Sequence, residues 1–390
     1  MRNALSHLGM AGLYALLFVG LLPAPAHEAT PPKTVAEALK PFVDNQTLAG
    51  AVTLVADRGK VLHHEAIGYA DVSGQRPMLV NALFWIASMS KPITAAALMI
   101  LVDEGKVKLD DPIEKYLPEF KGQWVIAEMG KDQLVLRKPK RLVTVRDVMN
   151  HTSGLAFRSA METPTIDVLS LQDAVRSYAL TPLNSEPGTK FVYSNAGINI
   201  GGRIIEVVSG MAYEDFLDKR LFGPLGMKDT TFWPNGEQLK RLAKSYKPGK
   251  DKTGLVETPI VHLKYPIADR KRGPCPAGGF FSTASDIGAF CQMVLNDGEY
   301  NGKRILSEKA VKQMTSRTTE AGVKANWGVG WSITGDGEFG HGGAFATNMS
   351  VDTKRGLVFV WMVQHNGFPG NGGQSQAAFR AAARELYTAK

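Results

Sequence analysis

The sequence has few cysteines and no clustered metal ligands. Only Cys275 and Cys291 occur among its 390 residues, which is too few for a disulfide-stapled scaffold, and neither has a companion at zinc spacing. His63-His64-Glu65 lies in an expected strand without a second ligand cluster, so the sequence predicts no metal and no cofactor. Cys291 lies in an apolar helical run, where free thiols are common. We therefore expect two unpaired cysteines, with one bridge between them as the alternative.

Long hydrophobic runs are also scarce. The one long apolar stretch, Leu8 to Leu22, follows Arg2 and precedes the small residues Ala24-Pro25-Ala26, a pattern typical of a cleavable secretory signal. A retained anchor is the alternative, but 15 residues that include three glycines are short for a bilayer span. We expect a signal peptide over 1–26, cleavage near Ala26, a periplasmic or secreted protein, and no stable membrane insertion.

Strong charge of one sign is absent as well. The formal net charge of +8 is mild for this length. The basic clusters at 137–141 and 269–272 are flanked by turn residues and lack interleaved aromatic residues, which indicates solvated loops rather than a nucleic-acid surface. We therefore expect a small-molecule substrate and no nucleic-acid partner, and the oligomeric state is not readable from the sequence.

The order of the strand and helix patterns predicts an α/β (α+β) fold. Two apolar runs flank Asp57-Arg58-Gly59 as a hairpin, and strand patterns return at Val329–Ile333, Phe345–Val351 and Leu357–Val363 before a helix at 376–387. Helical patterns dominate the middle of the chain. Strands at both ends indicate one antiparallel sheet built from both chain termini and flanked by helices, with a mostly helical lobe inserted.

These patterns also predict the domain organisation. We expect a single catalytic domain over 27–390. Its sheet lobe would comprise about 27–87 and 261–390, and its helical lobe about 88–260. A short hairpin around Lys131-Asp132 would be inserted in the helical lobe.

The run Ser88-Met89-Ser90-Lys91 is the most informative motif. It stands at the start of an expected helix from Pro92 to Val102, and residues three apart on a helix share a face. A lysine buried beside a serine can lose its proton through desolvation and then accept the proton of the hydroxyl. Taken alone, such a run is more often a helix cap followed by a solvated lysine, and the later motifs are needed to favour the catalytic interpretation.

A second motif, Tyr193-Ser194-Asn195, precedes a helix rich in small and aliphatic residues. A tyrosine near a serine and a lysine can relay protons when a neighbouring cation holds its phenol partly ionised. The amide of Asn195 could orient a substrate carbonyl. The alternative is a half-buried tyrosine with Asn195 as a helix cap.

A third motif is the glycine-rich run from Gly340 to Ala344, which we expect to precede a strand. Glycines let the backbone approach a ligand closely, and a free N–H there can face a developing oxyanion. A plain glycine-rich turn is the alternative. Trp327 and Trp331, just upstream, could wall an apolar acyl or alcohol pocket, or could equally be core aromatics.

Together the three motifs resemble the serine β-lactamase and penicillin-binding-protein superfamily. The resemblance is to its class C-like branch of esterases, D-amino-acid peptidases and β-lactamases, with the family VIII carboxylesterases as the nearest group. That family orders Ser-x-x-Lys, Tyr-x-Asn, and Lys-Thr-Gly or His-x-Gly as this chain does. Asn150–Leu155, Gly278–Thr283 and Leu109–Pro112 also resemble its scaffold, so the similarity covers nearly all of the mature chain.

The resemblance implies a role for each motif. Ser88 would be the nucleophile that forms an acyl-enzyme, and Lys91 and Tyr193 would shuttle protons. The backbone N–H groups of Ser88 and Ala344 would form the oxyanion hole. The implied substrate contacts are Asn195, His341, Gly342, Gly343, Trp327 and Trp331. We interpret His151, in a scaffold run, as structural.

One departure from the family bears on the substrate. His341 stands where β-lactamases of this fold usually carry lysine, and imidazole is only partly charged near neutral pH. The sequence therefore favours a carboxylesterase on small or medium acyl esters over a β-lactamase or a D-Ala-D-Ala carboxypeptidase or D-aminopeptidase. An acyltransferase and a penicillin-binding sensor without turnover are further alternatives. An α/β-hydrolase is disfavoured, because the chain has no Gly-x-Ser-x-Gly elbow.

Overall fold

The computed structural model describes residues 33–335 and 337–388. The expected signal peptide lies outside the described residues. None of the helices in the described part is long and apolar enough to cross a membrane.

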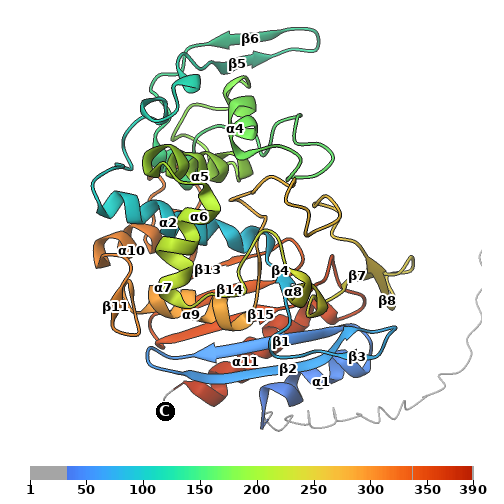
Figure 1. The fold of residues 1–390 in the computed structure, drawn as a ribbon. Coiled ribbons are helices and arrows are strands. Elements are labelled where there is room, and N and C mark those ends of the chain that lie inside the picture. The colour runs from blue at the N-terminus through green and yellow to red at the C-terminus, as the bar shows by residue number, and fades with distance from the viewer. Residues whose placement is uncertain (1–32, 336, 389–390) are drawn as a thin grey trace, which may run out of the picture. The chain divides into compact units, whose positions relative to one another are not determined.

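A seven-stranded antiparallel sheet is formed from the two ends of the chain (Figure 1). Its strand order is β12-β13-β14-β15-β1-β2-β3. The strands are β1 (Gly50–Ala56), β2 (Val61–Asp71), β3 (Arg76–Pro77), β12 (Ser332–Gly335), β13 (Glu338–Gly342), β14 (Asn348–Asp352) and β15 (Leu357–Met362). Strands β1 and β15 pair in the centre, with Val52 opposite Met362, so the expectation of one sheet built from both chain ends is confirmed.

The central strands are buried on both faces, which explains their continuous apolar sequences. Because side chains alternate between the faces of a strand, neighbouring residues of β1 enter two different cores. Leu54 packs into the large core that includes α9 (Ala284–Leu295). Val55 packs with α1 (Val35–Asp44) and α11 (Ser375–Tyr387) on the opposite face (Figure 1).

The middle of the chain is mostly helical, as expected. Its helices are α2 (Ser90–Asp103), α3 (Val145–Met149), α4 (Leu171–Ala179), α5 (Asn195–Ser209), α6 (Tyr213–Leu217), α7 (Gly223–Leu225) and α8 (Gly236–Lys240), and α10 (Glu308–Thr315) follows α9. The expected hairpin around Lys131-Asp132 is present as β5 (Val125–Met129) and β6 (Leu134–Arg137), at the end of the lobe farthest from the sheet (Figure 1). A second hairpin, β7 (Ser245–Pro248) and β8 (Leu255–Thr258), was not expected.

Two strand predictions near the third motif were wrong. Val329–Ile333 is not a strand over its length, because Gly330 has a φ of +78° and β12 begins only at Ser332. The glycine-rich run, expected to lie just before a strand, is itself largely strand β13, and the next strand begins at Asn348 instead of Phe345. Position 340 inside β13 requires glycine, because a Cβ atom there would collide with the carbonyl oxygen of Met349 on β14.

Cys275 and Cys291 are both free and buried. The expectation of two unpaired thiols is therefore confirmed.

Candidate active site

Ser88 lies in a short turn that connects the sheet lobe to α2. Residues Ala87–Met89 form a single 3-10 turn, and α2 follows directly from Ser90. Ala87 has a φ of +47°, a costly conformation for a residue with a Cβ atom. This tight turn places Ser88 at the mouth of the helix, where the sequence predicted it.

Lys91 lies one helical turn beyond Ser88 and is fully buried. Its Nζ atom lies 3.0 Å from Ser88 Oγ, 2.8 Å from Asn195 Oδ1 and 2.8 Å from the carbonyl oxygen of Ala277. Burial lowers the pKa of Lys91 to about 7. A substantial fraction of the amine is therefore neutral at physiological pH.

The partners of Lys91 orient its lone pair once it is neutral. Asn195 Oδ1 and the Ala277 carbonyl oxygen can only accept hydrogen bonds, so they take the two N–H groups of the neutral amine. The remaining lone pair then faces Ser88 Oγ, which can donate its proton. The helical-cap alternative with a solvated lysine is excluded by this burial.

Tyr193 lies beside Lys91, at the residue before the N-cap of α5. Lys91 Nζ is 4.7 Å from the centre of the Tyr193 ring. Burial raises the pKa of Tyr193 to about 12, although a hydrogen bond with Ser88 opposes this shift. The expectation of a partly ionised phenol was therefore wrong, because burial destabilises the phenolate more than the hydrogen bond with Ser88 stabilises it. In this structure Tyr193 is a proton donor.

Asn195 is the first residue of α5. Ser194, not Asn195, caps that helix, since its Oγ accepts the backbone N–H of Gly197 at 3.1 Å. The side chain of Asn195 is thus available to hold Lys91 and to line the cavity next to Ser88.

His341 closes the other side of the site, at the end of β13. Its Nδ1 lies 2.7 Å from the carbonyl oxygen of Gly342, so Nδ1 carries the proton and Nε2 is the acceptor. Nε2 lies 3.5 Å from the Tyr193 hydroxyl. Burial and the positive charge of Lys91 lower the pKa of His341 to about 3. The imidazole is therefore neutral, with less charge than the sequence suggested.

An aromatic cluster supports Tyr193 from behind. The His151 ring is 4.6 Å from the Tyr193 ring and 5.2 Å from the Trp327 ring. His151 is fully buried, and its Nδ1 accepts the backbone N–H of Ser194 at 3.1 Å. It therefore fixes the segment that carries Tyr193.

The two tryptophans proposed as pocket walls have different positions. Trp327 contacts the His341 ring, with 5.7 Å between the ring centres, and so borders the site. Trp331 is fully buried and stacks on Phe290 in the large core. Its assignment as a substrate contact is corrected, because the glycine-rich turn between the two rings directs Trp331 into the core.

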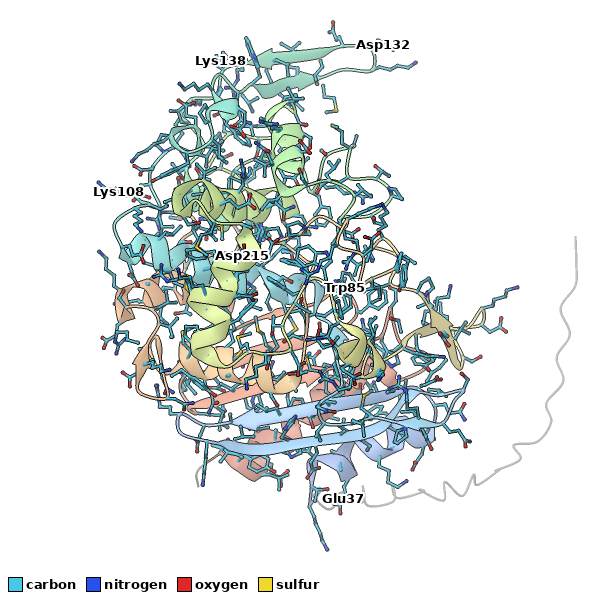
Figure 2. The ribbon with its side chains drawn as sticks, viewed as in Figure 1. Glu37, Trp85, Lys108, Asp132, Lys138 and Asp215 are labelled. Atoms are coloured by element: carbon cyan, nitrogen blue, oxygen red, sulfur yellow. The ribbon has the colours of Figure 1, made fainter. Side chains whose placement is uncertain are left out.

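Ser88 opens into a cavity of about 250 Å³. The cavity is lined by Trp85, Ala87, Ser88, Phe157, Arg158, Ile166, Asn195, His262, Ala277, Gly278 and Ala344. Trp85 lies between the sheet and the helical lobe (Figure 2). The cavity thus lies where strand ends and the start of α2 meet loops of the helical lobe.

Ala344 reaches this cavity through the turn after β13. The Gly343 N–H donates to the Thr347 carbonyl oxygen at 2.7 Å, and a Cβ atom on Gly343 would lie 2.5 Å from the Ile86 carbonyl oxygen. This close approach packs the turn against the residues that precede Ser88. Among the residues that the structure describes, the Ala344 N–H has no internal acceptor, as an oxyanion donor requires.

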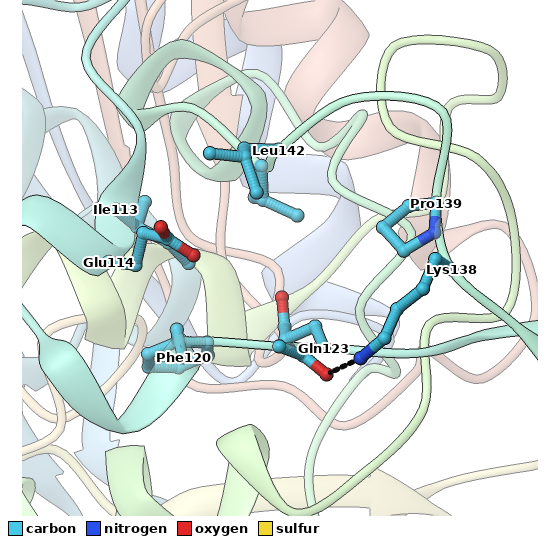
Figure 3. A pocket seen from close by; sticks show the side chains of 9 residues that line it. Ile113, Glu114, Phe120, Gln123, Lys138, Pro139 and Leu142 are labelled. Atoms are coloured by element: carbon cyan, nitrogen blue, oxygen red, sulfur yellow. Dashed lines mark hydrogen bonds between the residues drawn. The ribbon is translucent and has the colours of Figure 1, made fainter.

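Another cavity, of about 140 Å³, lies at the base of the β5–β6 hairpin (Figure 3). Its lining includes Phe120, Lys138 and Leu142, and Lys138 Nζ donates to the Gly122 carbonyl oxygen at 2.6 Å. None of the three motifs contributes to it. Over residues 33–335 and 337–388, no three metal-binding side chains converge at either cavity or elsewhere.

Sequence reasoning missed several residues of the site. The Ala277 carbonyl oxygen, which binds Lys91, is a backbone atom that no side-chain pattern marks, although the adjacent scaffold run from Gly278 was noted. Phe157, Arg158 and His262 line the cavity from loops without a motif. Only the folded chain brings these loops next to Ser88.

Comparison with known proteins identifies the family. A model of the Beta-lactamase family matches residues 35–383. Protein Rv1367c of Mycobacterium tuberculosis is 31% identical over 363 residues, which cover 84% of this chain and 88% of that protein. A Salmonella agona protein with the provisional name D-alanyl-D-alanine carboxypeptidase is 28% identical over 359 residues, which cover 82% of this chain and 80% of that protein.

A solved structure shares the fold. The structure of "EstCE1, a hydrolase with promiscuous acyltransferase activity" has a TM-score of 0.73 and 22% identity, and the match covers 89% of this chain and 97% of that chain. The family match and the shared fold agree with the order of the three motifs. The chain therefore belongs to the beta-lactamase family, within the superfamily of serine β-lactamases and penicillin-binding proteins.

Proposed function

We propose that this serine hydrolase is a carboxylesterase that forms an acyl-enzyme at Ser88 on small or medium acyl esters. The observation that carries the proposal is the contact between Ser88 Oγ and the buried Nζ of Lys91 at 3.0 Å. Because the pKa of Lys91 is lowered to about 7, this pair has a base ready near neutral pH.

Each chemical step is assigned to a group at the site. Neutral Lys91 accepts the Ser88 proton as Oγ attacks the ester carbonyl, and the N–H groups of Ser88 and Ala344 stabilise the oxyanion. Tyr193, which is protonated, donates a proton to the departing alkoxide and regains one from the Lys91 ammonium, which carries the proton taken from Ser88. Water then attacks the acyl-enzyme and gives its proton to Lys91. That proton passes to Ser88 Oγ as the acyl–oxygen bond breaks, which releases the acid and restores Ser88.

The neutral state of His341 favours esters over β-lactams. A β-lactam carries its carboxylate next to the leaving nitrogen, and the cation that would attract it is missing at the third motif, because the pKa of His341 is lowered to about 3. A simple ester needs no such cation. EstCE1, which shares this fold, is described as a hydrolase with promiscuous acyltransferase activity, which supports acyl-group chemistry on this scaffold.

The test is steady-state hydrolysis of p-nitrophenyl esters from acetate to octanoate, measured beside a chromogenic cephalosporin and a D-Ala-D-Ala peptide. We expect ester turnover that disappears in Ser88→Ala, with little cephalosporin or peptide turnover. Fast cephalosporin turnover with feeble ester turnover would contradict the proposal and indicate a β-lactamase. Covalent labelling by penicillin without turnover would indicate a sensor, and a transester product with added alcohol would indicate an acyltransferase.

We also propose that the protein is exported and that residues 1–26 are removed. The proposal rests on the charged, apolar and small-residue segments at the N-terminus. Mass spectrometry of protein from a periplasmic extract should give a chain that starts near His27. A chain that keeps Arg2 and sediments with membranes would contradict this.

A further inference from the structure

We propose that Arg158 binds a negatively charged group at the far end of the substrate's acyl chain. The preferred substrates would then be esters whose acyl part carries a terminal carboxylate. This inference rests on the proposed esterase function and names the substrate class of the same site.

The two sides of Ser88 differ in chemistry, which assigns the two halves of an ester. Tyr193 and His341, which handle the proton of the leaving alcohol, do not line the 250 Å³ cavity. Ser88 and Ala344, which would hold the carbonyl carbon and its oxygen, line the cavity, and Tyr193 borders it through Phe157, with 6.2 Å between the two ring centres. With the leaving alcohol placed at Tyr193, the acyl chain enters the cavity.

The cavity has apolar walls and a single fixed charge. Trp85, Phe157 and Ile166 supply surfaces for a short carbon chain. Of the lining residues within the described part of the chain, Arg158 is the one with a permanent charge, and none is acidic. Arg158 is exposed, so an uncharged acyl chain would leave its guanidinium to solvent.

Arg158 has hydrogen-bonding capacity to spare. Its guanidinium makes one long contact, from Nη1 to the Glu162 carbonyl oxygen at 3.4 Å, and no carboxylate among residues 33–335 and 337–388 forms an ion pair with it. The Glu162 carboxylate accepts from the Tyr178 hydroxyl at 2.6 Å and the Ser159 N–H at 2.9 Å, and it attracts Arg158 from a distance without forming an ion pair. A guanidinium offers five N–H donors in a fork that matches a carboxylate, so an external carboxylate can be bound in a bidentate manner.

His262, on the same wall, does not compete for the anion. It stacks on Trp85 with 5.6 Å between ring centres, and burial together with the charge of Arg158 lowers its pKa. The His262 imidazole is therefore neutral and would pack against the acyl chain of the substrate. A β-lactam would not use Arg158 in this way, because its ring carboxylate is attached on the leaving-group side.

The test compares two esters that differ in the charge of the terminal group and by one methyl group. Mono-p-nitrophenyl glutarate carries a terminal carboxylate, and p-nitrophenyl methyl glutarate has the same chain with that group neutralised. We expect the wild type to show a higher kcat/KM for the acid than for its methyl ester. Arg158→Gln should lower the acid-to-methyl-ester ratio about 10- to 100-fold, the range for a lost charge-assisted pair. Arg158→Glu should lower it further.

A matched control is Arg176→Gln. Arg176 is an exposed arginine on α4 whose guanidinium lies 3.9 Å from Asp173, outside the cavity, so the ratio should stay at the wild-type value. A ratio that does not change in Arg158→Gln, or a wild type that prefers the methyl ester, would overturn the inference. Absence of Ser88-dependent turnover of both esters would instead overturn the proposed esterase function.

Discussion

At the scale of single residues, the state of Lys91 decides what the site can do. The side chain is fully buried, yet its three contacts are a hydroxyl, an amide oxygen and a carbonyl oxygen instead of a carboxylate. Without a negative partner to stabilise the ammonium, desolvation dominates and the pKa falls to about 7. Surrounding a lysine with neutral acceptors thus produces a base.

This state predicts the pH dependence of the reaction. The value of kcat/KM for an ester should rise with pH and level off above about 7, as Lys91 loses its proton. Tyr193, whose pKa is raised to about 12, stays protonated throughout. Stopped-flow or steady-state rates between about pH 5 and about pH 9 measure the profile. An inflection near the ordinary histidine pKa of about 6.5 that is lost in His341→Gln would show that His341 titrates and would contradict its neutral assignment.

The same lysine predicts a pH dependence of stability. The free lysine has a pKa of about 10.4, so between about pH 7 and about pH 10 the unfolded chain holds a proton that the folded chain lacks. The lysine's cost to folding is therefore full at about pH 7 and shrinks as the pH rises. We expect the unfolding free energy of the wild type, relative to Lys91→Met, to increase over that range. Urea titrations of both proteins measure this, and a difference that is constant with pH would refute it.

At the scale of elements, the site depends on how closely β13 approaches the turn before α2. Gly342 and Gly343 are neighbours in the third motif, but their surroundings differ. A Cβ atom on Gly342 would meet Asn348 Nδ2 at 3.5 Å, an ordinary contact. One on Gly343 would lie 2.5 Å from the Ile86 carbonyl oxygen, a backbone atom that cannot move without shifting Ser88.

Gly343→Ala should therefore lower kcat by about 100-fold, because a shift of about 1 Å at the oxyanion turn misaligns the donors. Gly342→Ala should retain most of the activity. Ester kinetics of both variants, with circular dichroism to verify folding, provide the comparison. Equal losses in the two variants would mean that the tight approach to Ile86 does not control the site.

At the scale of the whole molecule, the sheet separates a catalytic side from a supporting side. The large core and Ser88 lie on the side of the helical lobe, and α1 and α11 cover the opposite face. Phe379 of α11 is fully buried there and stacks on Trp361 of β15, with 5.7 Å between ring centres. Its contribution is therefore to stability and not to chemistry.

Phe379→Ala should lower the unfolding free energy by about 3 to 5 kcal/mol through the cavity it leaves. Rates measured well below the melting temperature should stay near those of the wild type, because the site is on the other face. Leu180→Ala, at a side chain that is 84% exposed, is the control and should change stability by less than about 0.5 kcal/mol. A large loss of kcat in the folded Phe379 variant would contradict the separation of the two faces.

The order of motifs and the alternation of apolar residues were sufficient to predict the family, the sheet built from both chain ends and the helical lobe. These features are local, since Ser88 and Lys91 are three residues apart and strand β15 is a continuous apolar run. The prediction of two unpaired cysteines was also local, because it rested on the small number of cysteines and on the apolar residues around Cys291. The errors fell at the glycine-rich segments, where glycine fits both a turn and a tightly packed strand.

Only the tertiary structure decided the protonation states and the walls of the cavity. Whether Tyr193 is ionised, His341 charged or Trp331 in the core depends on burial by segments distant in the chain, and sequence spacing carries no measure of burial. The presence of Arg158 and Ser88 in one cavity depends in the same way on a loop of the helical lobe meeting the start of α2. Local sequence therefore determined which reactive groups this protein has, and long-range packing determined their charge and which of them face the substrate.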